Sequence, residues 1–228
     1  MFITLEGIEG SGKSTQARRL RQRLADAGHH ARLTREPGGT PLADAIRAVL
    51  MHPEAAEAAL RAARLAPDLP TGEAPEPVLP LTELLLLGAA RAQHTARIRA
   101  WLAMGEIVIS DRYADATRAY QGYGRALPMA HIAAIEALAT GGLRPDVTLL
   151  FDLPVAEGQR RKQLAHAAGG EWNRLDAEAL EFHERVRAGY LALAAAEPAR
   201  WVVLDAAAPP DALAQAVWAA LVPRLPSA

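Results

Sequence analysis

The sequence contains no cysteine, very little lysine and asparagine, and no long hydrophobic run. The absence of cysteine excludes a disulfide framework, a thiolate nucleophile and a cysteine-based zinc site. A formal net charge of −1 over 228 residues argues against bulk electrostatic binding of nucleic acid. The densest apolar run, residues 84–90, is too short to span a bilayer, and residues 1–6 lack the basic start of a signal peptide. The composition therefore predicts a soluble cytoplasmic protein without nucleic-acid or membrane partners.

The length predicts a single domain over residues 1–228, with two segments that depart from its core pattern. Residues 53–80 begin as an alanine-rich, helix-prone stretch and continue as a loop rich in proline and glycine over residues 67–75, which predicts an insertion. Residues 154–176 contain the basic run at 160–162 followed by two glycines at 169–170. We expect this second segment to form a small mobile lid.

Five short apolar runs alternate with helix-prone stretches along the chain. Because these runs are continuously apolar instead of alternating, they indicate strands of a parallel sheet that is covered on both faces. The predicted fold is α/β, a doubly wound parallel five-stranded sheet flanked by helices. The predicted strands are residues 2–5, 32–34, 107–109, 147–151 and 201–204, and the best-marked helices are residues 13–27, 42–50 and 84–104.

A phosphate-binding loop follows the first predicted strand, where residues 7–14 match the pattern G-x-x-x-x-G-K-[ST]. Glycines allow successive backbone N–H groups to turn toward a phosphate, and the helix that follows adds its partial positive charge. Lys13, one of only two lysines in the chain, is expected to contact the β- and γ-phosphates of ATP. The expected nucleotide-binding residues are Gly7, Ile8, Glu9, Gly10, Ser11, Gly12, Lys13, Ser14 and Thr15.

Charged residues stand directly after two further predicted strands. Asp111 follows the strand at 107–109 and is expected to hold Mg²⁺ together with the Ser14 hydroxyl. Arg35 and Arg112 also follow strands, so they are expected at the same sheet edge, where a guanidinium fork matches phosphate oxygens. If a second phosphate group bound at this edge accepted a phosphoryl group, such cations would hold it in place. Because this phosphate is already an anion, no general base would be needed to remove a proton from it.

Several short motifs occur in order along the chain. They are FITLEG at 2–7 leading into the loop, TREPGGT at 34–40, RAQH at 91–94, DRY at 111–113, AYQG at 119–122 and FHERVRAGY at 182–190. With these motifs in this order, the chain resembles thymidylate kinases, the P-loop enzymes that phosphorylate dTMP. The resemblance covers nearly all of the chain except residues 53–80, and it implies ATP and Mg²⁺ as cofactors, dTMP as substrate and a homodimer.

The resemblance also implies roles for residues outside the phosphate loop. Arg35 and Arg112 match the clamps on the dTMP phosphate, and Glu9 matches a carboxylate near the sugar 3′-hydroxyl. Tyr120 matches the aromatic side chain beneath the deoxyribose. The base-reading positions are Arg91, Thr117 and Gln121, while Leu87 stands where the family usually has a phenylalanine stacked on thymine and Ala116 stands where serine is common.

Gly10, the residue after Glu9, is not an arginine, which places the chain with the type whose catalytic arginines come from the lid. The catalytic residues implied are therefore Lys13, Arg112 and the lid residues Arg161 and Arg174. Arg161 matches the first lid arginine of the family, and it is the first choice to contact the transferring phosphoryl group. Gln163 and Ala165 stand where similar lids repeat arginine, which leaves Arg160, Lys162 and Arg174 as alternatives behind it.

Three other functions fit parts of the sequence. A nucleoside monophosphate kinase with a different base preference is the nearest alternative, because Leu87 leaves the base pocket open to other arrangements. A GTPase-like switch would need a D-x-x-G motif, which the sequence lacks, and an N-K-x-D motif, which residues 173–176 match only with Arg174 in place of lysine. A non-catalytic scaffold is disfavoured by the intact Lys13, Ser14 and Asp111.

Overall fold

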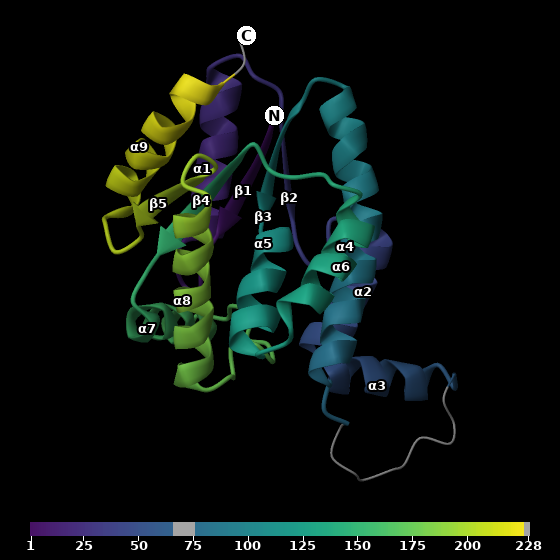
Figure 1. Ribbon diagram of the computed structural model, residues 1–228. Coiled ribbons are helices and arrows are strands. Elements are labelled where there is room, and N and C mark those ends of the chain that lie inside the picture. Colours follow the sequence, from purple (N-terminus) through teal and green to yellow (C-terminus); the bar gives the residue numbers. More distant parts are fainter. Residues whose placement is uncertain (66–75, 226–228) are drawn as a thin grey trace.

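The computed structural model describes residues 1–65 and 76–225, which form a five-stranded parallel sheet with helices on both faces (Figure 1). The strands lie in the order β2-β3-β1-β4-β5. Every predicted strand is present, and the doubly wound α/β prediction is confirmed. The strands are β1 (Phe2–Glu6), β2 (Ala31–Arg35), β3 (Ile107–Asp111), β4 (Val147–Asp152) and β5 (Trp201–Asp205).

Each predicted helix is present with shifted ends. The helix predicted from residue 84 begins at Pro80, because proline is well tolerated in the first turn of a helix. A helix also occupies the first part of residues 53–80, whereas the loop predicted at 67–75 lies outside the described residues. The helices are α1 (Lys13–Asp26), α2 (Pro41–Met51), α3 (Pro53–Ala62), α4 (Pro80–Ala103), α5 (Ala114–Thr117), α6 (Met129–Thr140), α7 (Val155–Ala167), α8 (Leu180–Ala196) and α9 (Pro210–Leu221), with a π-helical turn η1 (Arg118–Gly124) and a 3₁₀ turn η2 (Val222–Arg224).

The core lies on both faces of the sheet because successive strand residues point in opposite directions. In β3, Ile107 and Ile109 pack in one cluster with Leu24 of α1, whereas the intervening Val108 packs in a second cluster with Ile98 of α4. All five side chains are essentially inaccessible to solvent. This arrangement explains why the strand reads as continuously apolar.

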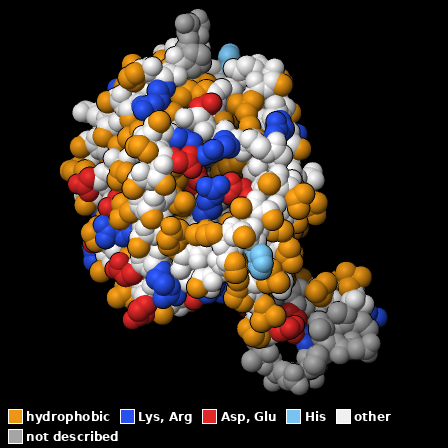
Figure 2. All heavy atoms as spheres, viewed as in Figure 1, with side chains coloured by type: hydrophobic (Ala, Val, Ile, Leu, Met, Phe, Trp, Pro, Cys, Tyr) orange, Lys and Arg blue, Asp and Glu red, His pale blue; other side chains and the backbone are white. Residues whose placement is uncertain are grey.

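Helix α3 projects from the body of the molecule (Figures 1 and 2). None of its residues is buried, and it packs against α2. Across residues 1–65 and 76–225, no helix combines the length and the apolar character needed to cross a membrane.

The parallel register brings the ends of three strands to one edge of the sheet. Asp111 at the end of β3 is paired with Leu5 of β1 on one side and with Arg35 of β2 on the other. The loops after β1, β2 and β3 therefore begin next to one another, as a ligand site at the carboxyl edge requires.

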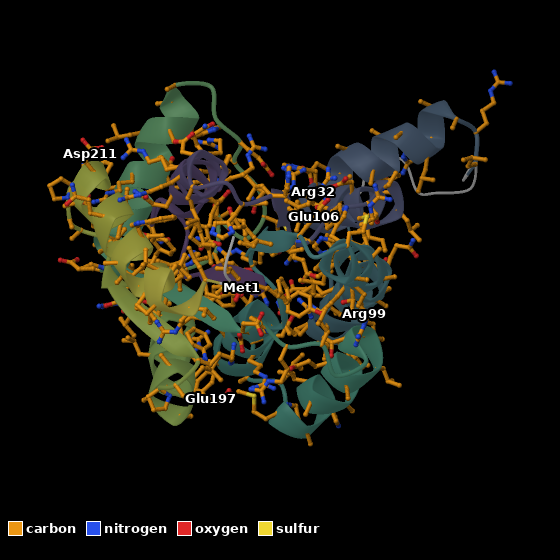
Figure 3. The ribbon with its side chains drawn as sticks, turned by 90° about the horizontal axis from the view of Figure 1, so that it is seen from above. Met1, Arg32, Arg99, Glu106, Glu197 and Asp211 are labelled. Carbon is orange, nitrogen blue, oxygen red and sulfur yellow. The ribbon has the colours of Figure 1, made fainter. Side chains whose placement is uncertain are left out.

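At the opposite, amino edge of the sheet, Arg32 and Glu106 form an ion pair of 2.5 Å (Figure 3).

Candidate active site

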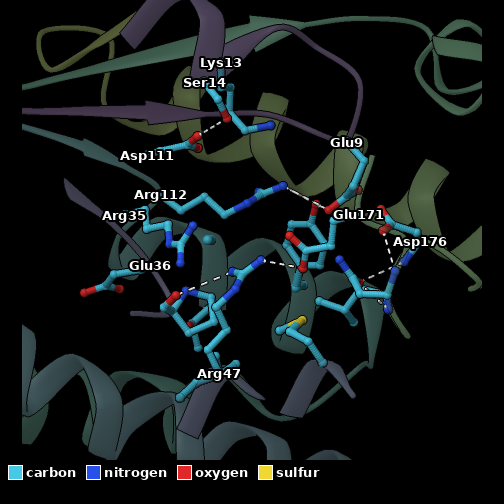
Figure 4. Close-up of a pocket in the computed structure, with 18 of the residues that line it drawn as sticks. Glu9, Lys13, Ser14, Arg35, Glu36, Arg47, Asp111, Arg112, Glu171 and Asp176 are labelled. Atoms are coloured by element: carbon cyan, nitrogen blue, oxygen red, sulfur yellow. Dashed lines mark hydrogen bonds and ion pairs between the residues drawn. The ribbon is translucent and has the colours of Figure 1, made fainter. Parts of the chain in front are cut away.

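A cavity of about 290 Å³ opens at the carboxyl ends of β1, β2 and β3. In Figure 2, acidic and basic side chains gather around a hollow in the middle of the face. Figure 4 shows Arg35, Arg47 and Arg112 converging on the space that Asp111 and Glu171 also approach. The structure therefore brings together residues from the first 14 positions, from α2 and from the segment after β3.

The loop that contains residues 7–12 lies between β1 and the helix α1, which begins at Lys13, so its predicted position is confirmed. The buried Lys13 ammonium donates to the backbone oxygens of Gly7 at 3.0 Å and Ile8 at 2.7 Å, and to Ser11 Oγ at 3.2 Å. Burial, aided by the nearby charge of Arg112, lowers the pKa of Lys13 to about 8. The ammonium is thus held inside the loop where phosphate oxygens would be bound.

Gly10 has no room for a side chain because the loop packs tightly against α7. A Cβ atom at this position would lie 2.2 Å from the backbone oxygen of Gly158, and the residue has a φ of +73°. A Cβ atom on Gly158 would in turn lie 2.6 Å from the backbone oxygen of Glu9. This contact supplies a steric reason why the position after Glu9 carries glycine instead of arginine.

Ser14 and Asp111 lie side by side, as the metal prediction requires. The Ser14 hydroxyl donates to Asp111 Oδ2 at 2.6 Å (Figure 4). A hydroxyl and a carboxylate are oxygen ligands of the kind that Mg²⁺ binds, usually through few protein groups together with waters and substrate phosphates. Within the described part of the chain, no cluster of three or more His, Cys, Asp or Glu side chains offers an alternative metal site. The donor set at Ser14 and Asp111 therefore fits Mg²⁺.

Arg112 is the most densely bonded cation of the site. Its backbone has a φ of +72°, an uncommon conformation for a residue with a side chain. One guanidinium nitrogen donates to the backbone oxygen of Gly7 and to the Tyr190 hydroxyl, both at 2.9 Å. The other donates to Glu9 Oε1 and to the Tyr120 hydroxyl, also at 2.9 Å. Arg112 therefore ties the phosphate loop to η1 and α8.

Glu9 lies at the centre of this network. The Tyr120 hydroxyl donates to Glu9 Oε1 at 2.6 Å, and His183 Nδ1 lies 3.5 Å from Glu9 Oε2. Burial opposes ionisation, but Arg112 and His183 together hold the pKa of Glu9 well below its ordinary value. Glu9 Oε2 and His183 Nε2 are buried without a hydrogen-bond partner.

The far end of the cavity is lined by the side chains expected to read the base. Arg91 is buried, donates to Glu36 Oε2 at 2.8 Å and to the Tyr113 backbone oxygen at 3.2 Å, and leaves Nη1 without a partner. Thr117 Oγ1 is likewise buried and unpartnered. Leu87, Thr117, Tyr120 and Gln121 all line this cavity, together with Ala116.

Arg35 also lines the cavity but is held loosely. Its side chain is 58% exposed, and its nearest acidic partner, Asp44 of α2, lies 3.6 Å away. Such an exposed pair contributes little stability, so the guanidinium can change partners at small cost. The strand-end position predicted for Arg35 is confirmed.

The two lid arginines do not line the cavity. Arg161 Nε donates to Glu157 at 2.7 Å, and its Nη1 donates to the backbone oxygen of Ala206 at 3.0 Å. Arg174 donates to the backbone oxygen of Leu50 and pairs with Glu83. The cation of this segment that lines the cavity is Lys162, whose Nζ lies 3.0 Å from Asp176 Oδ2.

Two charged residues of the cavity, Arg47 and Glu171, were missed by the sequence reasoning, as was the apolar Met51. Arg47 of α2 pairs with Glu171 at 3.0 Å, which joins α2 to the segment after α7 (Figure 4). The four-residue spacing of Arg47 and Met51, both of which line the cavity, places them on one helix face and was the available indication. Nothing local to Glu171 predicts the contact, because its partner lies 124 residues away.

The parallel sheet and the loop between β1 and α1 have the architecture of the nucleotide kinases. The thymidylate kinase family model matches residues 5–66 and 73–217, so it includes most of residues 53–80. The thymidylate kinase of Roseiflexus castenholzii is 45% identical over 237 residues, covering 100% of this chain and 95% of the relative. That of Pseudomonas fluorescens is 48% identical over 226 residues, covering 99% and 96%.

A solved structure agrees with the sequence matches. The crystal structure of thymidylate kinase from Ehrlichia chaffeensis superimposes with a TM-score of 0.71 at 30% identity, covering 97% of each chain. The chain belongs to the thymidylate kinase family.

Proposed function

We propose that this chain transfers the γ-phosphoryl group of MgATP to dTMP, giving dTDP and ADP. The observation that carries the proposal is one continuous cavity that runs from Lys13 and Ser14 to Leu87, Arg91 and Gln121. Such a cavity offers a phosphate cradle at one end and a set of directional polar atoms at the other. Membership of the thymidylate kinase family supports the same reaction.

The triphosphate binds along residues 7–15 in this proposal. The Lys13 ammonium exchanges its bonds to backbone oxygens for bonds to the β- and γ-phosphates, and their charge favours its protonated form. The Ser14 hydroxyl and the Asp111 carboxylate hold Mg²⁺, which when bound neutralises charge on the phosphates.

The phosphate of dTMP is held by Arg35 and Arg112. This acceptor is already an anion, so these residues have to position it and offset repulsion between two anionic groups, without removing a proton. Arg112 is fixed by Glu9, Tyr120 and Tyr190, whereas Arg35 is free to turn toward the ligand. The rigid and the mobile cation together form the clamp.

The sugar and the base occupy the remaining cavity. Glu9 accepts from the sugar 3′-hydroxyl through its unpartnered Oε2, and the ring of Tyr120 packs beneath the deoxyribose. The free Nη1 of Arg91 donates to a thymine carbonyl oxygen, while Thr117 and Gln121 contact the base edge. Leu87 provides an apolar contact to the thymine ring.

Residues 154–176 act as the lid. For Arg161 to contact the transferring phosphoryl group, its guanidinium has to leave Glu157 and the Ala206 backbone oxygen. The Arg161–Glu157 ion pair is only partly buried, so it contributes little stability and the charge of a bound nucleotide can draw the guanidinium away from it. Arg174 is the second choice, because its partner Glu83 is buried and this ion pair is therefore harder to break than the pair of Arg161 with Glu157.

Homodimer formation and a cytoplasmic location stay predictions. On α4, Leu81 and Leu85 are exposed and lie four residues apart, so one apolar strip of this helix is available to a second copy. A sizing column with light-scattering detection measures the number of copies.

Coupled measurement of ADP release tests the reaction. The purified chain is assayed with MgATP against dTMP, dUMP, UMP, CMP, GMP and AMP, and we expect dTMP to give the highest kcat/KM. Faster turnover of AMP, CMP or GMP would instead support a nucleoside monophosphate kinase of different base preference.

A further inference from the structure

Glu83 is a buried carboxylate that accepts hydrogen bonds from three side chains. It lies in the first turn of α4 with 2% of its surface exposed, and it does not line the cavity. Gln121 Nε2 donates to Glu83 Oε1 at 2.6 Å, and Arg125 Nε reaches the same oxygen at 3.4 Å. Arg125 Nη2 at 3.3 Å and Arg174 donate to Oε2. Burial opposes ionisation, but the hydrogen bond from Arg174 and the charge of Arg125 keep the pKa of Glu83 below its ordinary value.

The charge on Glu83 decides which end of the Gln121 amide faces the ligand. An ionised carboxylate can only accept hydrogen bonds, so the NH₂ group of Gln121 must point toward Glu83. Turning the amide over would place its carbonyl oxygen against the carboxylate, with no proton between them. Gln121 is itself 1% exposed and lines the cavity, so its carbonyl oxygen is the polar atom left for a ligand.

We infer that Glu83 is a positioning residue that sets base specificity by fixing the orientation of the Gln121 amide. The carbonyl oxygen of Gln121 accepts from the N3–H group of thymine. Cytosine carries a lone pair at N3, so the same oxygen repels it. This inference rests on the proposed function, because it assumes that the base of dTMP lies at this end of the cavity.

The variant Glu83→Gln tests the orientation directly. Arg125 Nη2 and Arg174 both donate at the Oε2 position and attract the oxygen of the new amide there, whereas the Oε1 position faces only one arginine donor, Arg125 Nε at 3.4 Å. The NH₂ group of the new amide therefore turns toward Gln121, which allows Gln121 to turn its own NH₂ group toward the cavity. The probes are dTMP and 5-methyl-dCMP, which differ only at positions 3 and 4 of the base. We expect the ratio of their kcat/KM values to fall about tenfold or more.

Glu178→Gln is the matched control. Glu178 pairs with the same two arginines, at 2.5 Å from Arg125 and 4.0 Å from Arg174, but has no bond to Gln121. This variant removes the same charge, so the ratio of the two kcat/KM values should keep its wild-type value. In a Gln121→Ala background, Glu83→Gln should no longer change the ratio, because the group through which it acts is missing.

Several outcomes overturn the inference while leaving the proposed function intact. They are an equal loss for both substrates in Glu83→Gln, an equal change of the ratio in Glu178→Gln, or a change that persists in the Gln121→Ala background. If Glu83→Gln does not fold, as judged by circular dichroism, Gln121→Ala alone must still lower the ratio, and an unchanged ratio refutes the inference. A wild-type enzyme inactive on dTMP would refute the proposed function instead.

Discussion

Glu6 offers a quantitative test of how the site is built, through the variant Glu6→Gln. The carboxyl group is completely buried at the end of β1. It accepts from the Tyr113 backbone N–H and from the Tyr190 hydroxyl, each at 2.8 Å. Burial and the nearby Asp115 raise the pKa of Glu6 from 4.5 to about 8, against the opposing charge of Arg112. The raised pKa favours the neutral form of Glu6 in the folded protein at pH values below about 8.

The sign of the pH dependence follows from proton binding. Between the ordinary pKa of 4.5 and the raised value of about 8, the folded state keeps a proton that the unfolded chain releases. The stabilisation that this proton provides is complete below pH 4.5 and is lost as the pH rises toward 8. Each pH unit in this window costs about 1.4 kcal/mol, so the wild type should lose about 3 kcal/mol over two units.

Urea unfolding at about pH 5.5 and about pH 7.5 measures this loss. Glutamine keeps an oxygen for the Tyr113 N–H but does not titrate. The contributions of all other titrating groups to the unfolding free energy therefore cancel when the wild type is compared with Glu6→Gln. We expect the unfolding free energy of the wild type to fall by about 3 kcal/mol relative to Glu6→Gln. A difference that does not change with pH would refute the neutral Glu6, and a change of opposite sign would mean that Glu6 is an ion-paired carboxylate.

Three further variants test the catalytic and base-binding residues. Lys13→Ala should lower kcat by several orders of magnitude with the fold intact, because stabilisation of charge on the transferring phosphate is worth about 3–4 kcal/mol or more. Arg161→Ala should lower kcat far more than it raises the KM for dTMP, because a lid arginine acts on charge that develops during transfer. Leu87→Phe should lower the KM for dTMP about twofold to tenfold, since Leu87 lines the cavity and aromatic stacking adds about 0.5–1.5 kcal/mol.

Steady-state kinetics and melting temperatures on the same preparations check these outcomes. Near-normal turnover of Lys13→Ala would remove the phosphate role of that lysine. If Arg174→Ala lowers kcat far more than it raises the KM for dTMP, and Arg161→Ala leaves both constants unchanged, the catalytic lid arginine is Arg174. A Leu87→Phe protein that melts lower with an unchanged KM would show that the base does not lie against position 87.

The sequence by itself determined the structural elements that depend only on residues close together in the chain. Residues 7–12 form a loop between strand and helix because glycines permit its backbone turns, and the apolar runs form strands because both of their faces are buried. The placement of Asp111, Arg35 and Arg112 at one edge also followed from the sequence, since parallel strands must end together.

Tertiary structure alone decided the partners of those charged side chains that pair with residues far away in the sequence. The pairs Arg47–Glu171 and Glu83–Arg174 join residues 124 and 91 positions apart, and no local pattern specifies such a distance along the chain. The π-helical turn η1, which carries Gln121, and the tight contact of Gly10 with α7 likewise depend on packing between elements. The basic run at 160–162 shows where cations are available, and the four-residue spacing of Glu157 and Arg161 is a local helical pair. Only the packing of distant segments decides that Arg161 also donates to the backbone oxygen of Ala206, 45 residues away, while Lys162 lines the cavity, because electrostatic interactions depend on distance in space.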